Sequence, residues 1–458
     1  MNSQTLTLWD WLITPLYILI ILVIASNIQK GKIKNNPIYK YYVWGLFAKI
    51  VGAISLCLIY VYYYKGGGDT IGYHEDAQIF INLFFDSPSN FFNTLLNLTP
   101  KDQQYYYFNS NTGFPGYWPD PPALNTVRFI TPIEMFGLRS YLASSVLMAV
   151  LSFSGVWKLY TLFSETYPNL YKQFAISILF VPSVLFWGSG LLKDSLTLAA
   201  ACWYCYSTYK IFIVKREYSL YILSLFISIF VMVAIKPYIF VALLPGSILW
   251  IMWSRIGNIK NGFLRILVTP LIIVVGVSIG MLLWGATSSD LGDYSSVDSM
   301  IIKANSSYED LKMDYYHGNS FDLGSYDASI SGIISKFPIG TMTGLFRPFL
   351  WEAKNPVMII SGLENLIILS MTLYFLVRRP VSFVSSLFSN PMVLFCMIFG
   401  VLFAFSVAIS TSNFGALVRL RIPAIPFFLT GLVLVEYLSR EKEKNKSVYS
   451  SRKVEYTN

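Results

Sequence analysis

The chain has 458 residues, of which 55% are hydrophobic and only 13% are charged, whereas a soluble domain carries about a quarter charged residues. Its mean hydropathy is +0.53. This composition excludes an ordinary soluble protein and predicts an all-α polytopic membrane protein, because apolar stretches of about 17–25 residues, the length of a membrane-spanning helix, recur along the chain.

The formal net charge of +9 does not predict nucleic-acid binding. The basic residues lie mostly in short loops between apolar runs and in the C-terminal tail, which is a topology signal. The first run is not typical of a secretion signal, because MNSQTLTLWDWL has no Lys or Arg and the basic cluster KGKIK follows the run. We therefore expect a retained helix with the N-terminus outside and the C-terminus in the cytoplasm.

We predict about eleven spans in a bacterial cytoplasmic (inner) membrane. They lie near 11–28, 41–63, 141–164, 173–190, 196–213, 218–235, 238–254, 264–284, 357–377, 391–410 and 420–438. This order places every clear basic cluster on the cytoplasmic side. We expect a single membrane-embedded domain over 1–438 and a charged, disordered tail over 439–458.

The apolar run from 218 to 254 decides the count. At ~1.5 Å per residue it is too long for one span, and Lys236-Pro237 stands at its middle, where a charge in lipid is costly. We predict two short helices that turn at the outer face. A single tilted helix is the alternative, but it would put the basic tail outside.

Two large outer loops follow from this topology, at about 64–140 and 285–356. The first contains DAQIFINLFFDSPSNFFNTLLNL, which predicts amphipathic helices on the membrane surface. It continues into QQYYYFNSNTGFPGYWPDPP, a turn-rich aromatic surface. All four cysteines fall inside predicted spans, so the Cys202-x-x-Cys205 pair reads as packing rather than as a metal or redox site.

Charged residues gather on the outer side near span ends, where the positive-inside rule does not explain them. The cations are Lys193, Lys236, Arg347, Arg419 and Arg421, and the acids are Asp69, Glu75, Asp76, Asp194 and Glu352. Ionisable groups at the membrane edge are functional candidates by default. Structural alternatives stay open: Arg347 can pair with Glu352, the later arginines can bind lipid headgroups, and Lys193 and Asp194 can cap helices.

A cluster of cations at the outer edge of the bilayer suits a phosphate or diphosphate carried by a lipid. An acid within hydrogen-bond reach suits deprotonation of a hydroxyl. Outer-loop Tyr and Trp suit the C–H faces of sugar rings. These three features together predict a polyprenyl-phosphate-linked sugar or oligosaccharide, a glycan acceptor and membrane lipids as partners.

The stretch KGGGDTIGYHEDA, residues 65 to 77, carries most of the acidic candidates. Its glycines allow a sharp turn and close approach of the backbone to a ligand. Asp69 is the first candidate for the catalytic base, with Glu75 and Asp76 as alternatives. Asp69 with His74 or Asp76 could hold a divalent cation, Mg or Mn, although a hydrogen-bonded role for His74 is the commoner outcome.

The acidic stretch in the first outer loop, the amphipathic segments and the many spans resemble the GT-C superfamily of membrane glycosyltransferases and the related Wzy-like O-antigen polymerases. FWGSGLLKDS, FRPFLWEAKNP and SNFGALVRLRIPAIP are similar to stretches in membrane proteins of bacterial polysaccharide loci. The resemblance implies a glycosyltransferase that moves sugar from a lipid carrier on the non-cytoplasmic face. It implies a catalytic role for Asp69 and a phosphate-binding role for the arginines. An extra leading span and the lack of an Asp-x-Asp in this stretch are departures.

Two other function classes remain. A transporter or flippase of a lipid-linked anionic glycan should show repeated halves and charges near the midplane of the bilayer, and the sequence shows neither. A scaffold subunit of an envelope complex would tolerate removal of single outer-loop charges.

Overall fold

The computed structural model describes residues 6–65, 67–215, 218–256, 296–313, 319–324 and 329–455. Every named element in these ranges is a helix, and Ser320 and Asn413 form an isolated antiparallel bridge. The predicted all-α class is therefore confirmed for this part of the chain. The chain divides into two compact units, and the single membrane-embedded domain over 1–438 stays a prediction.

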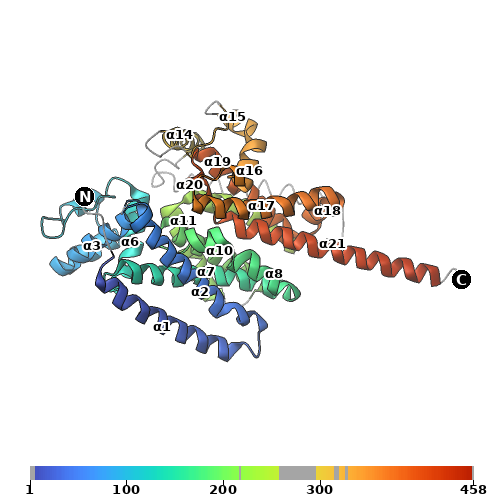
Figure 1. The fold of residues 1–458 in the computed structure, drawn as a ribbon, viewed down its shortest axis with the longest axis horizontal. Helices are drawn as coiled ribbons and strands as arrows, with labels where there is room; N and C mark the ends of the chain where they lie inside the picture. Colours follow the sequence, from blue (N-terminus) through green and yellow to red (C-terminus); the bar gives the residue numbers. More distant parts are fainter. Residues whose placement is uncertain are drawn as a thin grey trace. The chain divides into compact units, whose positions relative to one another are not determined.

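Unit 1 contains Met1–Ala175, Leu179–Ser207 and Ser219–Pro237 (Figure 1). Its elements are α1 (Leu8–Lys32), η1 (Pro37–Tyr41), α2 (Tyr42–Leu58), η2 (Ile59–Tyr63), α3 (Asp69–Asp86), α4 (Pro88–Leu95), α5 (Lys101–Tyr105), α6 (Pro121–Phe136), α7 (Tyr141–Thr166), η3 (Pro168–Leu170), α8 (Tyr171–Phe174), α9 (Pro182–Trp187), α10 (Lys193–Thr208) and α11 (Tyr218–Ile235). The element η4 (Ala175–Leu179) is shared, because its middle residues Ile176–Ile178 belong to unit 2.

Unit 2 contains Ile176–Ile178, Thr208–Tyr218 and Tyr238–Asn458. Its elements are η5 (Tyr209–Val214), α12 (Pro237–Ile256), α14 (Val297–Asp310), α15 (Ile330–Ser335), α16 (Phe337–Phe346), η9 (Leu350–Glu352), α17 (Pro356–Arg378), α18 (Pro380–Ser389), α19 (Pro391–Ser410), α20 (Phe414–Leu420) and α21 (Ala424–Glu455).

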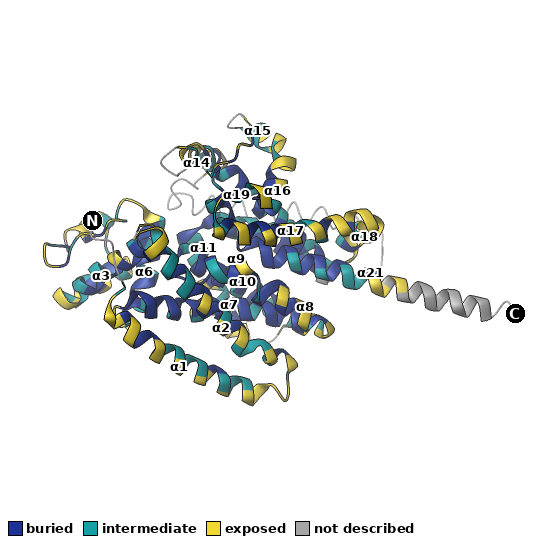
Figure 2. Ribbon diagram, viewed as in Figure 1, coloured by how far each residue is buried: buried dark blue, intermediate teal, exposed yellow. Residues whose placement is uncertain are grey.

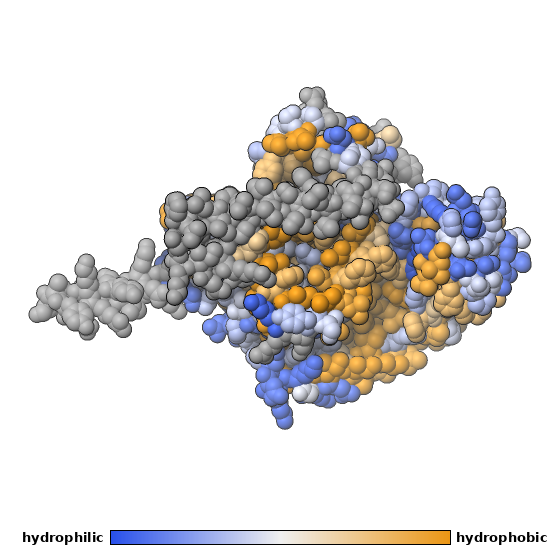
Figure 3. All heavy atoms as spheres, turned by 180° about the vertical axis from the view of Figure 1, so that it is seen from behind, coloured by the Kyte–Doolittle hydropathy of each residue, from blue (hydrophilic) through white to orange (hydrophobic). Residues whose placement is uncertain are grey.

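Helix α7 forms the centre of unit 1, because 72% of its apolar window is buried, whereas α1 buries only 17% of its own (Figure 2). The surface along α1 is apolar, and the side of the unit that holds α3 to α6 is largely hydrophilic (Figure 3). Helix α1 is attached through Asp10, whose carboxylate accepts hydrogen bonds from the Ser140 hydroxyl at 2.6 Å and the Leu142 N–H at 3.2 Å. An apolar helix with a small buried fraction is what a lipid-facing span requires.

Six helices in the described ranges are long and apolar enough to cross a membrane. They are Leu8–Lys32, Pro37–Tyr63, Tyr141–Thr166, Tyr218–Ile235, Pro356–Arg378 and Pro391–Ser410, and the pair Phe414–Leu420 and Ala424–Glu441, bent by 65°, makes a seventh if it counts as one span. The chain therefore has the character of a multi-pass membrane protein.

The remaining predicted spans differ from those six helices, and the count of eleven stays a prediction. The span at 173–190 is broken into η4 and the six residues of α9, because Pro182 cannot continue a preceding helix. The span at 196–213 is divided between α10 and the π-helix η5, and the span at 238–254 forms the shorter apolar helix Pro237–Trp253. The span at 264–284 lies outside the described residues.

The predicted break at Lys236-Pro237 is confirmed. Helix α11 ends at Ile235 and α12 begins at Pro237. A residue that precedes proline avoids the α conformation, and proline is favoured in the first turn of a helix, so the sequence alone stops one helix and starts the next.

Helix α21 continues to Glu455, and the disorder that we expected for 439–458 stays a prediction. Arg440 pairs with Glu436 one turn earlier, and Arg379 lies 3.4 Å from Glu443. Such i,i+4 pairs and a cross-helix contact favour continuation of the helix.

Close packing of α2 on α9 gives the first prediction. A Cβ atom at Gly52 would lie 1.9 Å from the backbone oxygen of Leu185, whereas a Cβ at Gly31 meets nothing within 4 Å. Gly52→Ala should lower the stability of the protein by about 1–3 kcal/mol, as overpacking of a core does. The measurement is thermal unfolding in detergent.

Gly31→Ala is the matched control, and it should be neutral or stabilise the helix by about 0.5–1 kcal/mol. Equal melting temperatures for Gly52→Ala and the native protein would contradict the close approach of α2 and α9.

Candidate functional site

The turn before α3 places Asp69 at the start of a helix. Gly68 has φ +103°, a left-handed conformation that favours glycine, and a Cβ there would lie 2.7 Å from the Tyr60 ring. The predicted glycine turn is confirmed at Gly68, whereas Gly66 lies outside the described residues. Asp69 is the first residue of α3 and is half-buried.

Asp76 binds the aromatic loop, the segment between α5 and α6, to α3. Its two carboxylate oxygens accept hydrogen bonds from the backbone N–H groups of Gly116 and Tyr117, each at 2.8 Å. Burial raises the pKa of Asp76, although these two hydrogen bonds oppose the rise. The Tyr117 ring lies over Gly72, where a Cβ would come within 2.8 Å of it. Asp76 therefore has a positioning role in this geometry.

The loop held by Asp76 ends at Asp120, the N-cap of α6, which meets Lys193 at the start of α10. The Lys193 ammonium lies 3.3 Å from an Asp120 carboxylate oxygen and 6.0 Å from the centroid of the Tyr73 ring. The Lys193 side chain is 18% exposed and that of Asp120 is 50% exposed. This pair is thus accessible to a solute, in contrast to the buried pair described below.

The charges around Lys193 act in opposite directions on its pKa. Burial lowers the pKa of Lys193, the charges of Asp120 and Asp69 raise it, and the charge of Lys236 lowers it, with a net decrease. Asp69 and Lys193 therefore belong to one electrostatic cluster. We call Asp69, Asp120, Lys193, Asp194 and Lys236 the charged cluster of unit 1.

Lys236 and Asp194 form the buried part of this cluster. The Lys236 ammonium lies 2.5 Å from an Asp194 oxygen, and their side chains are 8% and 1% exposed. Lys236 follows α11 directly and Asp194 is the second residue of α10, so the ion pair joins the end of one helix to the start of the other. A buried ion pair of this kind fixes geometry rather than adding much stability.

His74 is directed away from this chemistry. Its Nδ1 lies 2.8 Å from an oxygen of Glu134, which is fully buried in α6 and also accepts a hydrogen bond from Ser144 at 2.9 Å. Burial lowers the pKa of His74. The charge of Glu134 and its hydrogen bond raise the pKa by more than burial lowers it, so the pKa lies above its ordinary value. The commoner, hydrogen-bonded outcome for His74 is the one observed.

The divalent-cation site that we considered at Asp69 with His74 or Asp76 stays a prediction. His74 is bonded to Glu134, and both oxygens of Asp76 accept backbone N–H groups. Among the residues that the structure describes, no group of three His, Cys, Asp or Glu side chains gathers at metal-binding distance. Glu75 is exposed on α3.

In unit 2 the structure pairs Arg347 with Glu352, the structural alternative that the sequence left open. The two side chains form a short ion pair, and the guanidinium lies 5.4 Å and 5.0 Å from the ring centroids of Phe321 and Phe414. Both charged side chains are about one-fifth exposed. Arg347 is therefore held by one acid and two aromatic rings.

Arg421 is fully buried at the bend between α20 and α21. It donates to the backbone oxygens of Gly344 at 2.9 Å and Arg347 at 2.8 Å, and to the Asn365 side chain. Its hydrogen bonds thus connect three segments of unit 2. Arg419 is half-buried in α20. Substrate binding by these arginines stays a prediction.

Sequence reasoning missed Asp120 and Glu134. Asp120 stands before Pro121 and Pro122, an N-cap signature that would have placed it at a helix start beside the outer face. Glu134 left no such signal, because an acid in a predicted outer loop is ordinary. Its burial depends on the packing of α3, α6 and α7.

Comparisons of the chain with protein-family models, with curated proteins and with solved structures found no match. The site is therefore interpreted from its own geometry.

The His74–Glu134 pair predicts a pH dependence of stability. Because the pKa in the folded state lies above the ordinary value of 6.5, protonated His74 contributes stability that is fully present below about pH 6.5 and is lost as the pH rises through the folded pKa. His74→Gln should remove this part of the pH dependence of the melting temperature.

Glu134→Gln should flatten the same part of the profile, and the double variant should add little to either single change. A profile for His74→Gln that still falls as steeply as that of the native protein would show that other groups cause it.

The Lys236–Asp194 pair gives a separate prediction. Lys236→Met leaves a buried carboxylate without its cation and should cost about 3–5 kcal/mol of unfolding free energy. Lys236→Met with Asp194→Leu should recover much of this loss. Arg440→Gln, which breaks an exposed pair with Glu436, is the control and should melt like the native protein. A double variant less stable than Lys236→Met would contradict the coupling.

Proposed function

We propose that the protein is a membrane glycosyltransferase or polysaccharide repeat-unit polymerase that uses a polyprenyl-(di)phosphate-linked sugar on the non-cytoplasmic face. The observation that supports this proposal best is the accessible Lys193–Asp120 ion pair, whose lysine also experiences the charge of Asp69. These three residues stand at or next to the starts of α10, α6 and α3. A lysine is a compact cation for a phosphate, and a nearby carboxylate is a base for a hydroxyl.

The helix starts help this cluster to accept an anion. Each of α3, α6 and α10 begins at or next to a charged residue of the cluster, and each helix N-terminus carries about half of a positive charge. Lys236 already neutralises Asp194. The partial positive charges of the helix N-termini offset the two other carboxylates of the cluster, those of Asp69 and Asp120. A phosphate can then replace Asp120 as the partner of Lys193, since an exposed ion pair costs little to break.

In the proposed reaction the acceptor hydroxyl oxygen forms a bond to the anomeric carbon while the bond from that carbon to the phosphate oxygen breaks. Asp69 takes the hydroxyl proton. The carrier phosphate leaves with the bonding electron pair, and Lys193 stabilises its charge. The half-buried Tyr117 ring is the candidate surface for a sugar ring, and it packs on the fully buried Tyr73 ring with their centroids 4.8 Å apart.

The geometry favours Asp69 over the two other acids as the base. Both oxygens of Asp76 accept backbone N–H groups, Glu75 is exposed, and Asp69 is one of the charges that raise the pKa of Lys193. The roles of Arg347 and Arg419 as carrier-phosphate ligands remain predictions, and no step above requires them.

Asp69→Asn should lower the rate of sugar transfer by about 10²–10⁴-fold, the usual contribution of a general base. Lys193→Met should also lower it, through lost stabilisation of the leaving phosphate. The measurement is turnover of purified protein in detergent with a panel of polyprenyl-phosphate sugars, together with product amount and length in cells.

Asp86→Asn, at the exposed end of the same helix, is the matched control and should keep full activity. Turnover in detergent also excludes pure transport, which needs two compartments. Unchanged product in both Asp69→Asn and Lys193→Met, with the proteins inserted normally, would overturn the proposed function. Loss of activity only in Glu75→Gln would move the role of the base to Glu75.

A further inference from the structure

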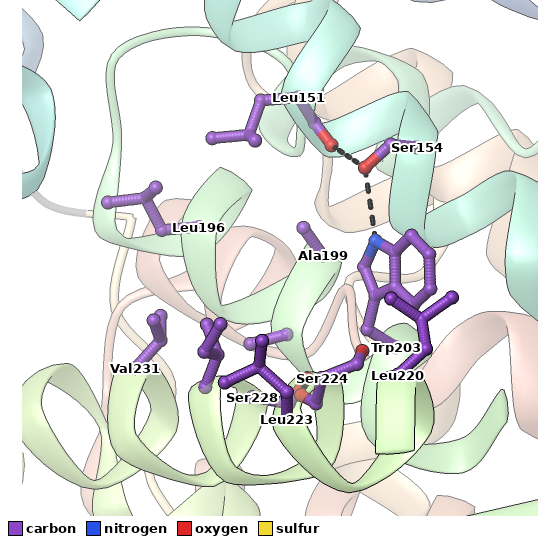
Figure 4. Close-up of a pocket in the computed structure, with 12 residues that line it drawn as sticks. Leu151, Ser154, Leu196, Ala199, Trp203, Leu220, Leu223, Ser224, Ser228 and Val231 are labelled. Atoms are coloured by element: carbon purple, nitrogen blue, oxygen red, sulfur yellow. Dashed lines mark hydrogen bonds between the residues drawn. The ribbon is translucent and has the colours of Figure 1, made fainter. Parts of the chain in front are cut away.

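Unit 1 contains an apolar groove between α7, α10 and α11, with a cavity volume of ≈ 310 Å³ (Figure 4). Its walls are mainly Leu, Ile, Val and Ala side chains. The serines in the wall are bonded within the protein: the Ser154 hydroxyl donates to the Leu151 oxygen, and the Ser228 hydroxyl donates to the Ser224 oxygen, each at 2.7 Å. The groove therefore offers an apolar surface and few hydrogen bonds to a ligand.

One end of the groove adjoins the charged cluster of unit 1. Leu196 and Val231 lie at this end in Figure 4. Leu196 follows Lys193 by one helical turn on α10, and Val231 is in the last turns of α11 before Lys236. The apolar groove thus begins about one helical turn from Lys193 along α10.

Trp203 lies at the other end. Its indole N–H donates to the Ser154 hydroxyl at 3.1 Å, and the Lys158 ammonium lies 5.0 Å from the ring centroid. These two contacts hold the indole in one orientation. From Leu196 to Trp203 the wall of α10 covers about 10 Å, at 1.5 Å per residue.

The groove is open to the surface of the unit along α11. Leu220, Leu223 and Ile227 line it and are 63%, 57% and 51% exposed. Helices α7 and α11 are both long and apolar enough to span a membrane. A ligand can therefore enter sideways from lipid, where a sugar or another polar molecule is excluded.

We propose that this groove binds the first part of the single hydrocarbon chain of a prenyl phosphate whose phosphate group lies at Lys193, and that Trp203 limits how deep the chain reaches. The charge of the cluster and the apolar groove together match a molecule with one anionic head and one chain. A phospholipid has two chains, of which this groove would hold one. The identity of the head rests on the proposed function.

The test uses the full-length protein in nanodiscs with a C20 prenyl phosphate that carries a diazirine on its second isoprene unit. After irradiation, peptide mass spectrometry should find the label on α10 and α11 around Ala199 and Leu223. A diazirine-bearing phosphatidylglycerol of equal concentration should not compete for these positions. Labelling spread equally over the exposed face of α1 would overturn the proposal, and so would equal labelling by phosphatidylglycerol.

Variants that fill the groove test it independently of the cation. Ala199→Leu should weaken labelling about tenfold, the effect of losing the burial of about two methylene groups. Leu223→Trp fills the groove from its exposed rim, where folding tolerates a larger side chain, and should act in the same direction. Leu19→Trp on the lipid-facing side of α1 is the matched control. Native labelling in both groove variants would overturn the proposal.

Binding of the phosphate at Lys193 and binding of the prenyl chain in the groove can be tested separately. Lys193→Met should reduce labelling by the prenyl phosphate but not by the corresponding uncharged prenol. If the groove is labelled but no donor supports sugar transfer, the groove proposal is supported and the proposed transferase function is refuted. If sugar transfer needs Lys193 but is unchanged in Ala199→Leu and Leu223→Trp, the proposed transferase function is supported and the groove proposal is refuted.

Discussion

The carboxylate of Asp76 is the constraint on which the candidate site depends. By accepting the N–H groups of Gly116 and Tyr117, it holds a long loop against α3 without any regular secondary structure in that loop. The loop in turn delivers Asp120 to the start of α6, within 3.3 Å of Lys193. A single buried acid thus positions the loop that leads to the start of α6. Asp76, the last residue of the stretch HED, is buried in this role, whereas Glu75 before it is exposed.

The candidate site also depends on helices that are interrupted, as in the segment that precedes α10. The short helix α9, which begins at Pro182, receives hydrogen bonds from neighbouring helices at its C-terminal end, where few backbone oxygens have a partner in the helix itself. The Lys49 ammonium of α2 donates to the Val184 oxygen at 2.9 Å, and the Ser152 hydroxyl of α7 donates to the Gly188 oxygen at 2.6 Å. A buried lysine and a serine are thereby explained as caps for the short helix α9. This interrupted segment leads directly into α10 and Lys193.

Unit 2 uses its arginines in a different way from the lysines of unit 1. Arg421 crosslinks the bend between α20 and α21 to the segment around Arg347, and Arg347 is held by Glu352 and two phenylalanine rings. Five donors on a rigid planar group suit such a crosslink. A lysine with one rotatable ammonium suits the exchange of one partner for another, as we propose for Lys193.

Composition and local pattern were sufficient to predict a helical membrane protein, the glycine turn at Gly68 and the helix break at Lys236-Pro237. These features follow from hydrophobic length, from the conformational freedom of glycine and from the fixed φ angle of proline, all of which act within a few residues. The partners of His74, Asp76 and Lys193 could not be predicted in this way. Glu134, Gly116 and Asp120 are separated from them by 60, 40 and 73 residues, and contacts at such separations exist only after α3, α6 and α10 have packed. Burial, which decides whether a charged group serves structure or remains accessible to a ligand, is a property of that packing and not of the local sequence.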